Sequence, residues 1–194
     1  MRLKKRFVAL AALIGAIAAI STVAFAANPH FKQGQTPTCT FSATTLQTDT
    51  VSCSGGTLAG LGNTDVGYKI TGGGFATFTC TNQGGTAAAG QNKAPVSVTP
   101  QETIIAADQI KNGNLALPNI SSTVPTPQNQ TGQNAVTVAG CPNKNWTGVA
   151  SGITLTSFTL TISQPPGTPI ITCTATSSTG FTAGQTVTPT CTAV

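Results

Sequence analysis

Apolar and hydroxyl-bearing residues alternate along a short stretch near the middle of the chain. Residues 77–81 read Thr-Phe-Thr-Cys-Thr. In an extended backbone, Phe78 and Cys80 point to one face and the three threonines point to the other. The Asn-Gln-Gly-Gly sequence that follows at 82–85 is typical of a turn. The pattern therefore predicts a β-strand with one buried face, and it places a cysteine in the core.

Similar alternation recurs through the rest of the chain. It is strongest between Ile153 and Ile162, where it slips once around Ser157 and predicts a β-bulge. Three consecutive glycines, Gly72–Gly74, are expected to separate the strand at 65–71 from the central one. Further strands are expected at 38–43, 50–54, 94–98, 102–106, 114–120, 169–177 and 185–193.

Many short strands, frequent Gly and Pro turns and no helical periodicity beyond the first residues predict an all-β fold. We expect an antiparallel, immunoglobulin-like β-sandwich that is cross-linked by disulfides and preceded by an N-terminal signal helix. Four segments are expected: a signal peptide at 1–26, an irregular N-terminal lead at 27–37, the sandwich at 38–164, and a C-terminal β-hairpin arm at 165–194, packed on the same domain.

The first segment has the three parts of an export signal. Basic residues at 2–6 precede an apolar run at 7–20, and Ala24-Phe25-Ala26 forms a small-x-small cleavage site. An uncleaved membrane anchor is the alternative interpretation. We expect secretion to the extracellular space or cell surface, with membrane contact only through the signal segment before cleavage.

Charge is scarce once the signal segment is set aside. The whole chain has a formal net charge of +5, but only 7% of its residues are charged. Its arginines lie in the signal segment, and the lysines beyond it nearly balance the four acidic residues. Nucleic acid and anionic membranes need clustered Lys or Arg, so neither is expected as a partner. Few charges also leave little electrostatic protection against association, so self-association is a possible outcome.

Six cysteines after an export signal predict a disulfide framework instead of free thiols or metal ligands. The sequence alone does not choose among the pairings, but local symmetry favours one set. Cys39 and Cys53 lie symmetrically about Leu46, as Cys173 and Cys191 do about Thr182, so each pair can face across a hairpin-like excursion. This set leaves Cys80 for Cys141.

A catalytic constellation is missing from the sequence. Beyond the signal there is one histidine, His30, and the four carboxylates form no recognisable catalytic or metal-binding motif. We expect no enzyme activity, no catalytic residues, no cofactor and no bound metal.

Five residues are candidate contacts for a ligand. Trp146 is the only tryptophan, and it either packs against a cystine or stacks on a sugar. The polar stretch 82–93 is long for a loop in a compact domain, and such loops often carry function. The candidates are Trp146, Tyr68, Asn82, Asn92 and Lys93.

Several short motifs occur in an order that resembles a group of small secreted proteins of unknown function from actinobacteria and related bacteria. They are Asn-Pro-His-Phe at 28–31, Ala-Gly-Leu-Gly-Asn at 59–63, Cys-Thr-Asn with two glycines at 80–85, Asn-Lys at 92–93 and Cys-Pro at 141–142. The resemblance covers about residues 27–162 and implies export and a Cys80–Cys141 bridge, with no catalytic residues. Cys39, Cys53, Cys173 and Cys191 depart from the group's pattern.

The first functional hypothesis is a non-catalytic extracellular β-sandwich with a structural or adhesive role, with surface proteins as possible partners. The second is a carbohydrate-binding module for cell-wall or environmental polysaccharide.

Overall fold

The computed structural model of the chain describes residues 28–43 and 49–194. The predicted signal peptide lies outside the described residues. Besides strands, the described ranges contain the short helix α1 (Gln133–Thr137) and the 3-10 turn η1 (Ala107–Gln109). None of their helices is long and apolar enough to cross a membrane.

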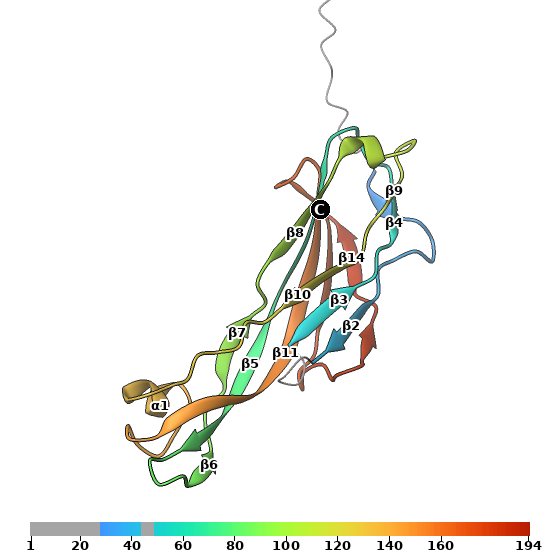
Figure 1. Ribbon diagram of the computed structural model, residues 1–194. Coiled ribbons are helices and arrows are strands. Elements are labelled where there is room, and N and C mark those ends of the chain that lie inside the picture. The colour runs from blue at the N-terminus through green and yellow to red at the C-terminus, as the bar shows by residue number, and fades with distance from the viewer. Residues whose placement is uncertain (1–27, 44–48) are drawn as a thin grey trace, which may run out of the picture.

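A seven-stranded antiparallel sheet, the main sheet, is built around two long strands (Figure 1). β5 (Val66–Thr81) and β11 (Thr147–Ser163) pair along almost their whole length. Beyond β11 lie β12 (Pro169–Thr176) and then β14 (Thr190–Ala193) at the edge. Three short strands pair with the other side of β5: β6 (Ala87–Ala89), β7 (Ala94–Ser97) and β8 (Gln101–Ile105).

A four-stranded antiparallel sheet packs against the main sheet. Its strands are, in order, β10 (Ile120–Thr123), β3 (Thr50–Cys53), β2 (Cys39–Ser42) and β13 (Thr186–Val187). Phe41 of β2 stacks on Phe181 with ring centroids 4.1 Å apart, and it meets Phe158 of β11 edge-on at 5.7 Å. All three side chains are buried. The predicted all-β sandwich is therefore confirmed.

A small sheet lies at one end of the sandwich. It contains β1 (His30–Phe31), β4 (Thr57–Ala59) and β9 (Leu115–Ala116). Figure 1 places β4 and β9 at the end of the molecule opposite α1 and β6.

The alternation predicted for the central strand is confirmed. Phe78 and Cys80 are buried, whereas Thr77, Thr79 and Thr81 lie on the other face and are partly exposed. The outer face continues this pattern across neighbouring strands, because the register aligns Thr71, Thr159, Thr174 and Thr190 in one row. The outer face of the main sheet is thus rich in hydroxyl groups.

The prediction that Gly72–Gly74 would break the chain into two strands is wrong. β5 runs through all three glycines without interruption. A Cβ on Gly74 would meet the carbonyl oxygen of Thr154 on β11. The glycines thus permit close approach of two backbones, a role that glycine has within strands as well as in turns. The bulge predicted near Ser157 is present as a register shift between Leu155 and Ser157.

Segment 165–194 is more than the appended hairpin arm expected from the sequence. β12 and β14 do form an antiparallel pair. However, β12 also continues the main sheet beyond β11, and β13 crosses over to pair with β2 of the second sheet. The segment therefore contributes strands to both layers of the sandwich. Its apolar residues, including Phe181, are part of the core that the two layers share.

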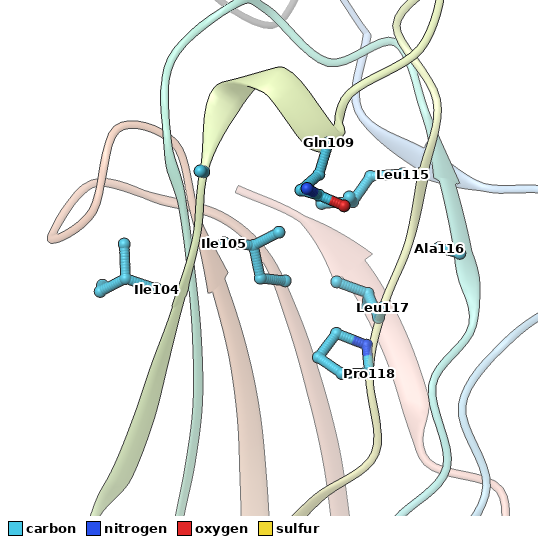
Figure 2. A pocket seen from close by; sticks show the side chains of 8 residues that line it. Ile104, Ile105, Gln109, Leu115, Ala116, Leu117 and Pro118 are labelled. Carbon is cyan, nitrogen blue, oxygen red and sulfur yellow. The ribbon is translucent and has the colours of Figure 1, made fainter.

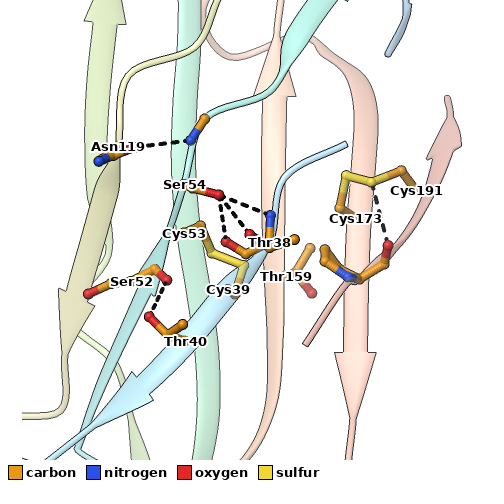
Figure 3. The surroundings of a disulfide bond; sticks show 12 residues. Thr38, Cys39, Thr40, Ser52, Cys53, Ser54, Asn119, Thr159, Cys173 and Cys191 are labelled. Carbon is orange, nitrogen blue, oxygen red and sulfur yellow. Dashed lines mark hydrogen bonds between the residues drawn. A yellow bond between two sulfur atoms is a disulfide. The ribbon is translucent and has the colours of Figure 1, made fainter. Parts of the chain in front are cut away.

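The disulfides follow the favoured pairing: Cys39–Cys53, Cys80–Cys141 and Cys173–Cys191. The first and third join directly opposed residues of neighbouring strands, β2–β3 and β12–β14 (Figure 3). Beside Cys39–Cys53, the hydroxyl groups of Thr38 and Ser54 lie 2.8 Å apart and form a hydrogen bond. Three disulfides indicate that the protein folds in an oxidising environment.

Candidate functional site

Tyr68 is not a surface contact, although the sequence suggested it as one. It lies on β5 between Val66 and Ile70, which share its inward face, and its side chain is 0% exposed. Its hydroxyl group has no hydrogen-bond partner among the described residues. Burial raises the pKa of the Tyr68 phenol above its ordinary value, because the charged form would be poorly solvated. Tyr68 is therefore a core residue.

The other four candidates gather at one end of the molecule, which we call the tip. The tip consists of residues 82–93 and 130–148, which connect to β5 and β11 at the end marked by α1 and β6 (Figure 1). Asn82 and Trp146 line one hollow there, and Asn92 and Lys93 line another.

Several cross-links hold the tip in place. The Cys80–Cys141 disulfide joins the end of β5 to the segment that follows α1, with the two Cα atoms 5.6 Å apart. Gln130 and Gly148 exchange two backbone hydrogen bonds of 2.7 and 2.8 Å. Irregular segments can position side chains reproducibly when they are tied to a sheet in this way.

The first hollow, the Trp146 pocket, has a volume of about 430 Å³. Trp146 is half-buried and packs partly against the core, and it also lines the pocket. The structure thus combines the packing role and the surface position that the sequence presented as alternatives. Its lining is otherwise mainly polar: Thr81, Asn82, Gln83, Thr131, Gly132, Lys144, Asn145, Thr147 and Val149.

The second hollow has a volume of about 380 Å³ and involves Asn92 and Lys93. The side-chain amide of Asn92 donates a 2.9 Å hydrogen bond to the carbonyl oxygen of Thr137 at the end of α1. The Lys93 ammonium lies 4.2 Å from the ring centroid of Phe75, a cation–π contact. Both side chains therefore have structural contacts here, which makes this hollow the weaker candidate.

Sequence reasoning missed Thr131 and Lys144 of the Trp146 pocket. Lys144 could have been found, because it is two residues from Trp146 in the sequence. Thr131 could not have been found, because it lies far in the sequence from both predicted contacts, Trp146 and residues 82–93. The Gln130–Gly148 bridge brings its segment to the pocket.

The sequence analysis also missed an apolar hollow at the opposite end of the sandwich (Figure 2). It has a volume of about 480 Å³, and Ile104, Ile105, Leu115, Leu117 and Pro118 line it together with Ala106, Gln109 and Ala116. Ile104 is 54% exposed. The adjacent isoleucines, which interrupt the alternation of apolar and polar residues, were the available signal.

The described residues contain no group of three or more His, Cys, Asp or Glu side chains that could hold a metal ion. His30 donates a 2.7 Å hydrogen bond from Nδ1 to the carbonyl oxygen of Asn28. A comparison with protein-family models gives no match, and comparisons with curated proteins and with solved structures give no significant match. Function is therefore argued from the geometry.

Proposed function

We propose that the protein is a secreted, non-catalytic β-sandwich of the cell surface or extracellular space, with a structural role based on association of its strand edges. The three disulfides and the hydroxyl-rich, sparsely charged outer face support a stable extracellular component. The observation that carries the structural role is the outer edge of β14, which pairs with no further strand among the described residues.

The backbone of β14 has polar groups that point away from the sheet. The Cα atoms of Cys173 and Cys191 are 3.9 Å apart, which is closer to the spacing of about 4.5 Å in a non-hydrogen-bonded antiparallel pair than to about 5.5 Å in a hydrogen-bonded one. The N–H and C=O groups of Cys191 therefore point away from β12, and by alternation those of Ala193 do so as well. Consistently, the next residue, Val194, donates its N–H to Ile170. Beside this edge lies a hollow of about 330 Å³, between β14 and residues 28–31.

This edge has few of the features that protect natural edge strands from pairing. β14 contains no charged residue and no proline, whereas β7 on the opposite edge contains Pro95 and β8 contains Glu102. An antiparallel pair of β14 strands from two copies is self-complementary about a two-fold axis at Thr192. In that pair, Cys191 of each copy exchanges hydrogen bonds with Ala193 of the other.

Native mass measurement tests the structural role. We expect the protein with its disulfides intact to form dimers or larger species, and Ala193→Lys to shift it to monomer, because it would place two like charges on the same face, diagonally across the axis. Ser97→Lys on β7 introduces the same charge at an exposed position on the other edge and is the control. A wild-type protein that stays monomeric at high concentration would refute the proposal, as would equal effects of the two substitutions.

A second candidate function is binding of extracellular polysaccharide at the Trp146 pocket. The specific observation is an aromatic ring in a concave, largely polar site that is held by a disulfide, a combination suited to a sugar ring and its hydroxyl groups.

A further inference from the structure

Two side chains of the Trp146 pocket have only hydrogen-bond donors to offer a ligand. The Lys144 ammonium and the Trp146 indole N–H are donors by their chemistry. The side-chain oxygen of Asn82 accepts a 2.8 Å hydrogen bond from the backbone N–H of Thr86, and the NH₂ group of Asn82 adds two further donors. A matching ligand would supply acceptors, and an anionic group supplies the strongest ones.

The charge distribution favours the same kind of ligand. Lys93 and Lys144 are the charged residues of the tip, and no carboxylate lines the Trp146 pocket. The carboxylates lie elsewhere: Asp49 is buried beside Thr50 of the second sheet, Glu102 is in β8, Asp108 is in η1, and Asp65 accepts a hydrogen bond from Ala107 at the start of η1. The tip is therefore positively charged, whereas the lysines and carboxylates of the other described residues nearly balance.

We infer that the Trp146 pocket binds an anionic polysaccharide. A sugar ring lies against Trp146, the acidic substituent of that sugar or its neighbour accepts from Lys144, and the amide of Asn82 donates to a ring hydroxyl or to the same substituent. This inference rests on the second function proposed above and adds the chemical class of the ligand. Carboxylate and sulfate substituents share the required chemistry, and the test compares them.

Affinity electrophoresis or biolayer interferometry of the disulfide-intact protein would use three probes: alginate, dextran sulfate and unmodified dextran. We expect binding to one or both anionic polymers, none to dextran, and weaker binding at higher salt. Lys144→Gln should weaken binding about fivefold, as expected for one solvent-accessible charge-assisted contact. Lys32→Gln, the same charge change beside β1 at the other end, should leave binding unchanged.

Trp146→Ala should abolish binding, and Trp146→Phe should retain part of it. The melting temperature of each variant separates a lost contact from a lost fold, and Lys144→Gln provides a test that does not disturb the core. Equal binding to dextran and dextran sulfate would overturn the anionic preference and leave polysaccharide binding standing. Equal losses with Lys144→Gln and Lys32→Gln would overturn the assignment to this pocket. No binding to any of the three polymers would refute both polysaccharide binding at this pocket and the preference for an anionic ligand.

Discussion

Single residues on the strands have roles that their neighbours in the sandwich determine. Tyr68 is the clearest example, because a residue type that often contacts ligands at surfaces is here fully buried, and its hydroxyl has no hydrogen-bond partner in the part of the chain that the structure describes. A buried polar group without a hydrogen bond lowers the stability of the folded state. Tyr68 therefore affects stability instead of ligand binding.

Tyr68→Phe removes this hydroxyl and keeps the ring. We expect the free energy of unfolding at neutral pH to rise by about 1 kcal/mol, measured by urea denaturation with disulfides intact. A loss of stability of similar size would contradict the assignment, because it would show that the hydroxyl makes a favourable interaction.

The pH dependence of stability provides an independent readout of the same residue. Because burial raises the folded-state pKa of Tyr68, the unfolded chain releases this proton at lower pH than the folded protein does. The contribution of Tyr68 to the free energy of unfolding is thus constant below a pH of about 10. Above that pH it falls progressively, by up to about 1.4 kcal/mol per pH unit. The Tyr68→Phe variant should lack this component, so identical alkaline profiles for both proteins would contradict the assignment.

At the scale of elements, the pairing of β5 with β11 organises the fold. Both strands are far longer than the usual five or six residues, and their pairing continues through two register shifts on β11. Close approach of the strands at Gly74 is part of this pairing.

Gly74→Ala should destabilise the protein by about 3 kcal/mol, because the new methyl group would meet the Thr154 carbonyl, which the strand pairing holds in place. Gly73→Ala is the matched control. Its Cβ would lie 3.2 Å from the Val96 carbonyl oxygen on the short strand β7, which can shift more easily, and we expect a loss below about 1 kcal/mol. Equal melting temperatures for the two variants would show that the close approach of β5 and β11 does not require glycine at position 74.

At the scale of the whole molecule, the disulfides have different consequences because they close loops of different length. Cys80 and Cys141 are 61 residues apart in sequence, and this bridge ties the tip to the main sheet. Cys39 and Cys53 are 14 residues apart and already face each other on paired strands.

Replacing both Cys80 and Cys141 with alanine should lower the free energy of unfolding by about 4 kcal/mol, and replacing Cys39 and Cys53 by about 3 kcal/mol. Only the first double variant should also increase hydrogen exchange at residues 130–148, since it releases the tip. A larger loss from the Cys39–Cys53 replacement would contradict the loop-length argument.

The sequence by itself determined the strand character, the two-layer class and the favoured disulfide partners. Each depends on local regularity: a period of two in apolar and hydroxyl residues, and cysteines placed symmetrically about a turn. Phe78 and Cys80 could be assigned to the buried face because residues two apart in a strand share a face wherever the strand lies. The Cys39–Cys53 pair could be assigned because residues symmetric about a turn face each other across a hairpin.

Only the tertiary structure decided the continuity of β5 through Gly72–Gly74, the burial of Tyr68, the crossing of β13 to the second sheet and the assembly of the Trp146 pocket. Each depends on contacts between segments far apart in the sequence. A glycine that permits a turn and one that permits close strand approach look the same in a sequence, and the partner backbone tells them apart. Likewise, Thr131 and Lys144 share a pocket with Asn82 because strand pairing and a long-range disulfide bring their segments together.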